Sequence, residues 1–358
     1  MPHIRHQREP DFRQFLRVLR NQVPDRPVLY ELFLNDVLYQ RLAGRPAPVR
    51  PGATASPGEI AAYLPTAGKW YADAFAAAGY DYATLSPTLP YPGLRFRSTG
   101  HQKLRSHSLN EGAVISGWND VESFPWPDTT ALDPAAVDAV TSEFPDWMQA
   151  TFVIPNGILE NLIELVGYDQ LCYLLVDDRP LVKEISDRIG ASLMGFYNVI
   201  ASHPRVGFLI VNDDWGFKTQ TMISPDDLRE FVFPWVRKFT AAAQEAGKPV
   251  LLHSCGQLES VMDDVIDDLG FSAKHSFEDV ILPIEDAYER WGERIALMGG
   301  IDVDYLCTAN AEAITTRSRA MLERAANRGG YALGSGNSIP EYIPTNAYFA
   351  MTRAALER

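Results

Sequence analysis

Cysteine and long apolar runs are both scarce in this chain of 358 residues. Its three cysteines are too few for a disulfide framework, so we expect a cytoplasmic protein that works in a reducing compartment. No apolar run reaches the ~18 residues that a membrane span requires. Residues 1–20 are polar and charged, without the apolar region of a signal peptide. We therefore expect no association with a membrane.

Positive charge is also in deficit. Lysine and arginine number 32 against 46 aspartates and glutamates, which gives a net charge of −14. Nucleic-acid binding depends on a basic surface, so this balance argues against nucleic acid as a partner. Hydrophobic residues make up 46% of the chain and charged residues 22%, which is typical of a soluble globular protein. The length suits one large domain or two ordinary ones.

Short apolar segments alternate with amphipathic ones along most of the chain. Segments typical of strands lie near residues 28, 81, 152, 208, 250, 272, 295 and 331, with helical segments between them. Such alternation favours a parallel sheet with crossover helices, and eight units are the number in a closed barrel. A doubly wound open sheet is the rival, but no Gly-x-Gly-x-x-Gly turn follows a strand. We predict an α/β fold, a single (β/α)8 TIM barrel over residues 1–358 with an N-terminal helical extension at 1–26.

The segment Lys248–Gly256 (KPVLLHSCG) ends in a histidine and a cysteine two residues apart. Side chains at positions i and i+2 of a strand point to the same face, so His253 and Cys255 should stand side by side. A neutral imidazole and a thiolate are both zinc ligands. Taken alone, the pair favours a simpler interpretation, a buried thiol beside a core histidine, because structural zinc patterns carry four ligands.

Polar residues also follow the other predicted strands, where a barrel places its active site. The strand-end set consists of Glu31, Asp213, Asp214, His253, Cys255, His275, Asp302, Ser335 and Asn337. Simpler interpretations exist: Glu31 as a solvated residue, Asp302 as a turn cap, and His275 as a packed core histidine. The tandem acids Asp213 and Asp214 suit an Asx turn, but repulsion between them in a pocket would raise one pKa, as general acids and bases require.

Five short motifs in order give the chain a family resemblance. They are Asn212–Gly216 (NDDWG), Ile223–Pro225 (ISP), His253–Gly256 (HSCG), Gly299–Asp302 (GGID) and Gly336–Pro340 (GNSIP). Together they resemble the uroporphyrinogen decarboxylase superfamily, most strongly over residues 205–355. The resemblance implies a single (β/α)8 barrel, in agreement with the strand positions.

Two branches of that superfamily differ in what they bind. The decarboxylase branch binds a porphyrinogen with eight carboxylates, using an Arg-Gln-Ala-Gly-Arg type segment at the end of its first strand. Here Leu29–Phe33 (LYELF) carries an acid and no arginine, the residue that binds carboxylates in a bidentate way. Arg41–Arg45 (RLAGR) matches four of the five letters but lies past the strand, where we expect a loop. It keeps a decarboxylase as the alternative function.

The other branch comprises corrinoid-dependent methyltransferases, whose His-x-Cys pair and a cysteine near the last strand bind zinc. His253 and Cys255 match this pattern, whereas Gly334–Ser338 (GSGNS) has no cysteine. The resemblance thus implies a zinc site with an incomplete set of ligands. Oxygen ligands to complete it would come from Glu31, Asp213, Asp302 or Asn337.

The predicted function is methyl transfer, assisted by zinc, between a small methylated substrate and a corrinoid cofactor (cobalamin) or corrinoid protein. The predicted roles are catalysis for Asp213, Asp302 and His275, substrate binding for Glu31, Asp214, Ser335 and Asn337, and metal binding for His253 and Cys255. A separate corrinoid protein is the expected partner, and the oligomeric state is left open, a homodimer included. A substrate-binding member without catalysis is a further alternative.

Overall fold

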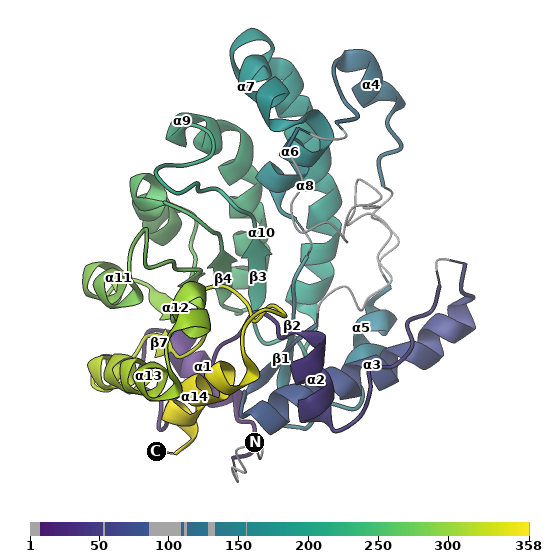
Figure 1. Cartoon of the computed structure of the whole chain (residues 1–358). Helices are drawn as coiled ribbons and strands as arrows, with labels where there is room; N and C mark the ends of the chain where they lie inside the picture. Colours follow the sequence, from purple (N-terminus) through teal and green to yellow (C-terminus); the bar gives the residue numbers. More distant parts are fainter. Residues whose placement is uncertain are drawn as a thin grey trace.

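The computed structural model describes residues 8–52, 54–85, 109–110, 113–127, 133–154 and 156–357 (Figure 1). The α-helices within these ranges are α1 (Phe12–Leu19), α2 (Asp36–Ala43), α3 (Pro57–Ala78), α4 (Trp118–Ser123), α5 (Pro134–Thr141), α6 (Ile158–Val166), α7 (Tyr168–Asp177), α8 (Arg179–Ser202), α9 (Pro225–Asp227), α10 (Phe233–Glu245), α11 (Ile284–Trp291), α12 (Val303–Thr308), α13 (Ala311–Ala325) and α14 (Thr345–Leu356). The strands are β1 (Tyr82–Leu85), β2 (Gln149–Phe152), β3 (Leu209–Asn212), β4 (Val250–His253), β5 (Ala273–His275), β6 (Ala296–Met298) and β7 (Tyr331–Ala332). None of these helices combines the length and apolar composition that crossing a membrane requires.

All strand pairings between these elements are parallel, as the alternation predicts. One sheet has the order β3-β4-β5-β6-β7, and β1 pairs with β2 in a second sheet. A bridge between Ala150 and Val206 joins the two sheets, and a bridge between Leu29 and Leu333 places the segment near residue 28 beside β7. The prediction of a parallel α/β fold is therefore confirmed.

The segment near residue 28 is shorter than the strand that the sequence predicts there, since Leu29 forms only an isolated bridge. Between this segment and β1, the hydroxyl of Tyr82 replaces main-chain pairing. It accepts a hydrogen bond from the Glu31 amide and donates one to the Glu31 carbonyl, both at 2.8 Å. Because no strand ladder closes this position in the described ranges, the closed barrel stays a prediction.

Helices surround the strands. Figure 1 shows the strands in the middle of the molecule, and α8, α10, α11 and α13 contact β3, β4, β6 and β7 from outside. All four residues of β1 and of β4 are buried, as expected for parallel strands covered on both faces. The predicted N-terminal extension contains α1, whose Phe15 ring lies 4.6 Å from that of Tyr82 and 5.0 Å from that of Phe208. Since these partners stand where β1 and β3 begin, α1 covers the end of the sheet opposite the predicted site.

Two helical segments contain turns that are not α-helical. Between β4 and β5 the chain forms a 3-10 turn at Glu259–Val261 followed by a π-helical segment at Asp264–Asp268. The helix that begins at Pro225 continues through a π-helical segment at Leu228–Val232 into α10, and Pro234 follows directly after that segment.

Candidate metal centre

The carboxyl ends of three neighbouring strands form the floor of the site. The register places Asn212 of β3 opposite His253 of β4, and His253 opposite His275 of β5. Residues just beyond these ends, including Asp214 and Cys255, therefore meet at one edge of the sheet. This is the arrangement that parallel pairing predicts for polar residues that follow adjacent strands.

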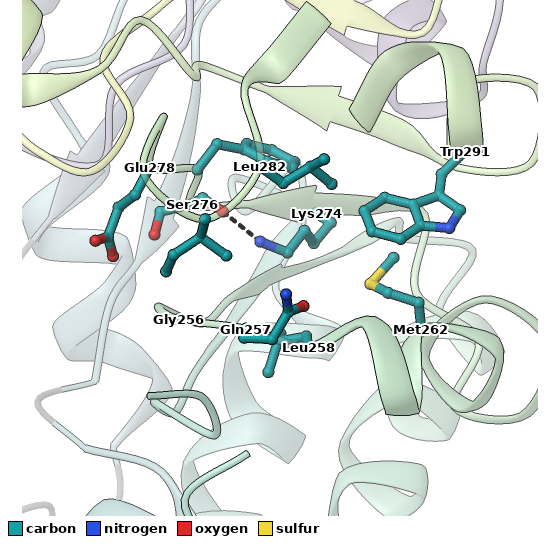
Figure 2. A pocket seen from close by; sticks show the side chains of 11 residues that line it. Gly256, Gln257, Leu258, Met262, Lys274, Ser276, Glu278, Leu282 and Trp291 are labelled. Carbon is teal, nitrogen blue, oxygen red and sulfur yellow. Dashed lines mark hydrogen bonds between the residues drawn. The ribbon is translucent and has the colours of Figure 1, made fainter. Parts of the chain in front are cut away.

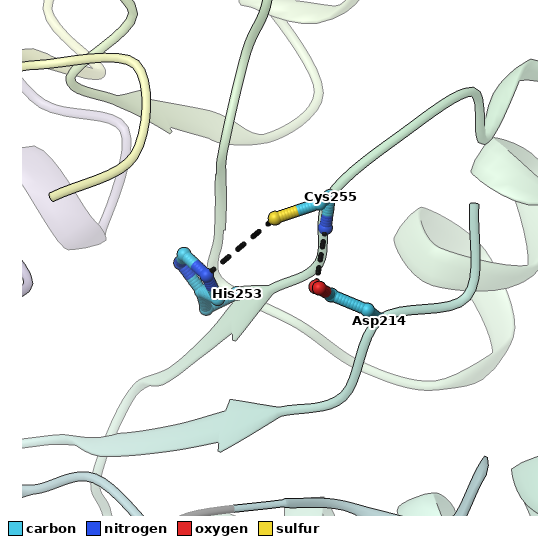
Figure 3. A group of neighbouring side chains, drawn as sticks. All are labelled: Asp214, His253 and Cys255. Carbon is cyan, nitrogen blue, oxygen red and sulfur yellow. Dashed lines mark hydrogen bonds between the residues drawn. The ribbon is translucent and has the colours of Figure 1, made fainter. Parts of the chain in front are cut away.

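Three of these side chains converge to form a triad of Asp214, His253 and Cys255. One ligand atom from each, an oxygen, a nitrogen and a sulfur, lies within 4.8 Å of the other two. Figure 3 shows both Asp214 and His253 beside Cys255: Asp214 Oδ1 accepts from the Cys255 amide at 2.8 Å, and His253 Nε2 lies 3.9 Å from the Cys255 Sγ. The structure thus brings the predicted pair together and adds Asp214, which the sequence assigns to substrate binding.

The chemistry of the triad fits a zinc ion, which accepts nitrogen, sulfur and oxygen ligands together. Burial lowers the pKa of His253 to about 4, so its imidazole is neutral, as a metal ligand must be. Burial, and then the charge of Asp214, raises the pKa of the Cys255 thiol well above its ordinary range. A cation at the triad would counter both effects and favour the thiolate.

Two hydrogen-bond donors approach the sulfur of Cys255 from other elements. Asn337 Nδ2 lies 3.3 Å from Sγ, and Ser276 Oγ lies 3.5 Å from it. Asn337 belongs to the segment after β7, where the sequence lacks the expected cysteine. Its amide reaches the triad as a donor to sulfur, a contact that stabilises negative charge on the sulfur.

His275 lies behind His253 and is fully buried. Its Nδ1 is 2.8 Å from Nδ1 of His253, and its Nε2 is 3.2 Å from the carbonyl oxygen of Ser335. Burial, and then the neighbouring His253, lowers its pKa well below the ordinary value. The predicted catalytic histidine therefore has both ring nitrogens in hydrogen bonds within the protein.

Glu31 and Ser335 contact each other rather than solvent. The carboxylate of Glu31 accepts from the Ser335 hydroxyl at 2.5 Å and from the Ser335 amide at 3.2 Å. Glu31 is 0% exposed, and burial raises its pKa to about 8. The simpler interpretation of Glu31 as a solvated strand-end residue is wrong.

The two adjacent aspartates after β3 face different partners. Asp214 belongs to the triad. Asp213 instead accepts three hydrogen bonds of 3.0 Å from the first amides of α6 and one of 2.8 Å from the Trp215 indole. A carboxylate is favourable at the positive end of a helix. Gly157 makes the approach possible, because a Cβ there would lie 2.3 Å from the Asp213 side chain. Burial nevertheless raises the pKa of Asp213 to about 6.

Asp302 is the N-cap of α12. It accepts hydrogen bonds from the amides of Tyr305 at 3.0 Å and Asp279 at 2.9 Å. This is the capping interpretation that the sequence left open beside a catalytic one.

Glu160, in the first turn of α6, is a site residue that the strand-end survey missed. Burial, and then the charges of Asp214 and Asp213, raises its pKa well above the ordinary value, which favours a protonated carboxyl. The available signal was its position shortly after β2, at the same edge of the sheet as the triad.

A pocket beside the triad contains a second missed residue, Lys274 of β5. Figure 2 shows its side chain between Ser276, Met262 and Trp291. Its ammonium donates to the Ser276 carbonyl and lies 4.1 Å from the centre of the Phe277 ring. Burial lowers the pKa of Lys274 to about 8. Ser276 therefore separates the pocket from the triad, with its hydroxyl on Cys255 and its carbonyl on Lys274.

Comparisons with known proteins agree with the arrangement of strands. The family model for uroporphyrinogen decarboxylase (URO-D) matches residues 157–358. Among solved structures, a methyltransferase from Methanosarcina mazei is similar over 96% of this chain and 97% of its own, with a TM-score of 0.65 and 16% identity. A putative vitamin-B12 independent methionine synthase from Listeria monocytogenes is similar over 97% and 96%, with a TM-score of 0.47 and 11% identity. No curated protein matches the sequence.

Proposed function

Because the chain belongs to the uroporphyrinogen decarboxylase family, we propose that it is a methyltransferase of the corrinoid-dependent branch. It would move a methyl group between a small methylated substrate and a corrinoid carried by a partner protein. The observation that carries this proposal is the triad of Asp214, His253 and Cys255 at the ends of neighbouring strands. The likeness in fold to a methyltransferase along nearly the whole chain supports it, as does an order of parallel segments that suits a (β/α)8 barrel.

Zinc is the cofactor that we propose for the triad. When bound, it would supply a Lewis acid that keeps a thiolate available at neutral pH. In this proposal Asp214 takes the place of the missing cysteine as the third ligand. Ser276 and Asn337 direct their donors at the Cys255 sulfur, so they hold the negative charge that forms there.

Of the acids Glu160, Asp213 and Asp302, only Glu160 is suited to proton transfer. Glu160 carries a favoured proton beside Asp214, so we assign it as the donor to a leaving group. The oxygens of Asp213 and Asp302 are taken up by backbone amides at the starts of α6 and α12. We therefore assign these two predicted catalytic residues to positioning the helices that flank the site.

Metal analysis of the purified protein tests the proposal. We expect stoichiometric zinc after exposure to the metal, lost in Cys255→Ser and in Asp214→Asn. Cys172→Ser is the matched control, because Cys172 is exposed on α7 and its loss should leave the zinc content unchanged. Wild-type protein without zinc under zinc-replete conditions would contradict the proposal and favour a substrate-binding member without catalysis.

Methyl transfer itself is tested with free methylcobalamin and 2-mercaptoethanol as a simple thiol acceptor. We expect zinc-loaded wild-type protein to accelerate loss of the methylcobalamin absorbance. The Cys255→Ser variant should react at the rate of the protein-free control. Equal rates for wild type and variant would show that the triad takes no part in the transfer.

The decarboxylase alternative depends on the Arg41–Arg45 segment. Arg41 lies in the last turn of α2, not in the expected loop, and its guanidinium stacks 5.1 Å from the centre of the Phe349 ring. Arg45 forms an ion pair with Asp73 at 2.7 Å. Both arginines contact neighbouring helices, which favours methyl transfer over binding of a polycarboxylate. An absorbance titration with a porphyrinogen decides the matter: binding that Arg41→Ala and Arg45→Ala abolish would establish the alternative.

A further inference from the structure

A continuous line of hydrogen bonds runs from the segment after β7 to the triad. It passes from the Ser335 carbonyl to His275, from His275 to His253, and from His253 toward the Cys255 sulfur. We infer that His275 is a positioning residue, which sets the tautomer of His253 so that the Nε2 lone pair faces the triad. For its effect on metal this inference rests on the proposed zinc site, whereas the tautomer itself does not.

The protons in this line follow from one group that can only accept. The carbonyl oxygen of Ser335 has no proton to give, so Nε2 of His275 must donate across their 3.2 Å contact. In a neutral imidazole the other nitrogen then carries the lone pair, and Nδ1 of His275 accepts from Nδ1–H of His253 at 2.8 Å. Only Nε2 of His253 is left with a lone pair, and that atom is the one beside Cys255 Sγ.

The groups around His275 oppose the reversed tautomer of its ring. Its ring stands edge-on to Tyr30 with the ring centres 4.8 Å apart. The Ser335 carbonyl is anchored by a second bond, from the Gly300 amide at 2.8 Å. Gly299 admits the contact, because a Cβ there would lie 2.1 Å from the Ser335 oxygen and 3.1 Å from Nε2 of His275. A reversed tautomer of His275 would set its Nε2 lone pair against the Ser335 carbonyl oxygen in a buried place, at the expense of that hydrogen bond.

Glu31 stabilises the same line of hydrogen bonds at Ser335, the end farthest from the triad. It holds Ser335 through both the amide and the hydroxyl, so the residue whose carbonyl directs His275 is fixed on three sides. Glu31 and Ser335 thereby acquire a role other than the predicted substrate binding. They support the ligand histidine from behind, without contact with solvent.

The choice of histidine as the support has an electrostatic consequence. Metal-bound histidines usually donate their second N–H to a carboxylate, a backbone carbonyl or water. Here the acceptor is a neutral imidazole, so it adds no charge. One carboxylate and one thiolate, from Asp214 and Cys255, then balance the charge of a dication. A carboxylate in place of His275 would add a further negative charge to those of Asp214 and Cys255.

Two variants of His275 separate positioning from simple filling of space. His275→Gln offers an amide oxygen to accept from His253 and an amide nitrogen to donate to Ser335, whereas His275→Phe fills the volume and offers neither. Cys172→Ser is the control, because Cys172 is exposed on α7 and lies outside this line of hydrogen bonds. The readouts are ¹⁵N NMR of the histidine rings in metal-free protein and zinc affinity by competition with a chelator.

We expect the Nδ1–H tautomer for His253 in wild type, His275→Gln and Cys172→Ser. Loss of support for a ligand histidine typically weakens metal binding by about 10- to 100-fold, and we expect this in His275→Phe with near wild-type affinity in His275→Gln. An Nε2–H tautomer of His253 in wild type would overturn the inference, as would equal weakening in both His275 variants. If wild type binds no zinc, the proposed function fails, and the wild-type tautomer alone decides the inference.

Discussion

Replacing Glu31 with glutamine should remove the contribution of this residue to the pH dependence of stability over the neutral range. Burial raises the pKa of Glu31 from its ordinary 4.5 to about 8 in the folded protein. A group with a raised folded-state pKa holds its proton more tightly when folded. Its contribution to stability is therefore complete below pH 4.5 and is lost as the pH rises through 8. Each pH unit in this window corresponds to about 1.4 kcal/mol, so the whole window is worth roughly 5 kcal/mol at most.

Glutamine is a close substitute for the protonated acid. Its oxygen can accept from the Ser335 amide, and its NH2 group can donate to the Ser335 hydroxyl, so both contacts of Glu31 have a counterpart. We expect wild type and Glu31→Gln to have similar free energies of unfolding at pH 5. Toward pH 8 the variant should become more stable than wild type by a growing margin.

Denaturant unfolding followed by circular dichroism at pH 5, 6, 7 and 8 measures this margin. Glu293→Gln is the control, since Glu293 is exposed and its replacement should shift the stability equally at every pH. Wild-type and Glu31→Gln curves that stay parallel from pH 5 to 8 would refute the reasoning. They would mean that Glu31 ionises in the folded protein as it does in the unfolded chain.

Two substitutions elsewhere in the site make further predictions. Asp213→Asn should lower the free energy of unfolding by about 1–3 kcal/mol, because an NH2 group replaces one of the two oxygens that accept the amides at the start of α6, and should leave zinc affinity near wild type. Asp214→Asn should weaken zinc binding and leave the free energy of unfolding near wild type. Chelator competition measures the zinc affinity of both variants, and thermal unfolding measures their stability. Lys274→Met should stabilise the protein at pH 7 by up to roughly 3 kcal/mol, because burial lowers the lysine pKa from 10.5 to about 8. That gain should shrink as the pH rises from 8 to 10.5, and an equal gain at all pH values would contradict the assigned cause.

The parallel order and the placement of His253 with Cys255 could be predicted because both follow from short periodicities. Strand-like segments alternate with helical ones, and side chains two apart in a strand share a face. The sequence predicts a strand near residue 28, whereas the structure has only a bridge between Leu29 and Leu333, at the other end of the chain. Local pattern contains no information about a partner so far away.

The division of labour among the acids could not be predicted for a related reason. Asp213 and Asp214 follow the last residue of β3, where the strand periodicity no longer dictates direction. Which one turns to the triad depends on the amides at the start of α6, some 54 residues earlier in the chain. Glu160 was missed because an acid in the first turn of a helix has an ordinary explanation in the helix dipole. Lys274 was missed because the strand-end set contains its neighbour His275, whose side chain lies on the other face of β5.

Burial of His253 and Cys255 sets the pH dependence of zinc binding. His253, with a pKa of about 4, is already neutral at neutral pH, whereas the raised pKa of Cys255 keeps its thiol protonated. Zinc must therefore displace one proton, from Cys255, and its affinity should rise about tenfold per pH unit between pH 6 and 8. Calorimetric titrations in buffers of different ionisation enthalpy count the protons released, and Cys255→Ser should release none. A release of two protons would show that a second group, His253 or Glu160, also loses a proton when zinc binds. A release of none in wild type would show that Cys255 is already a thiolate or is not a ligand.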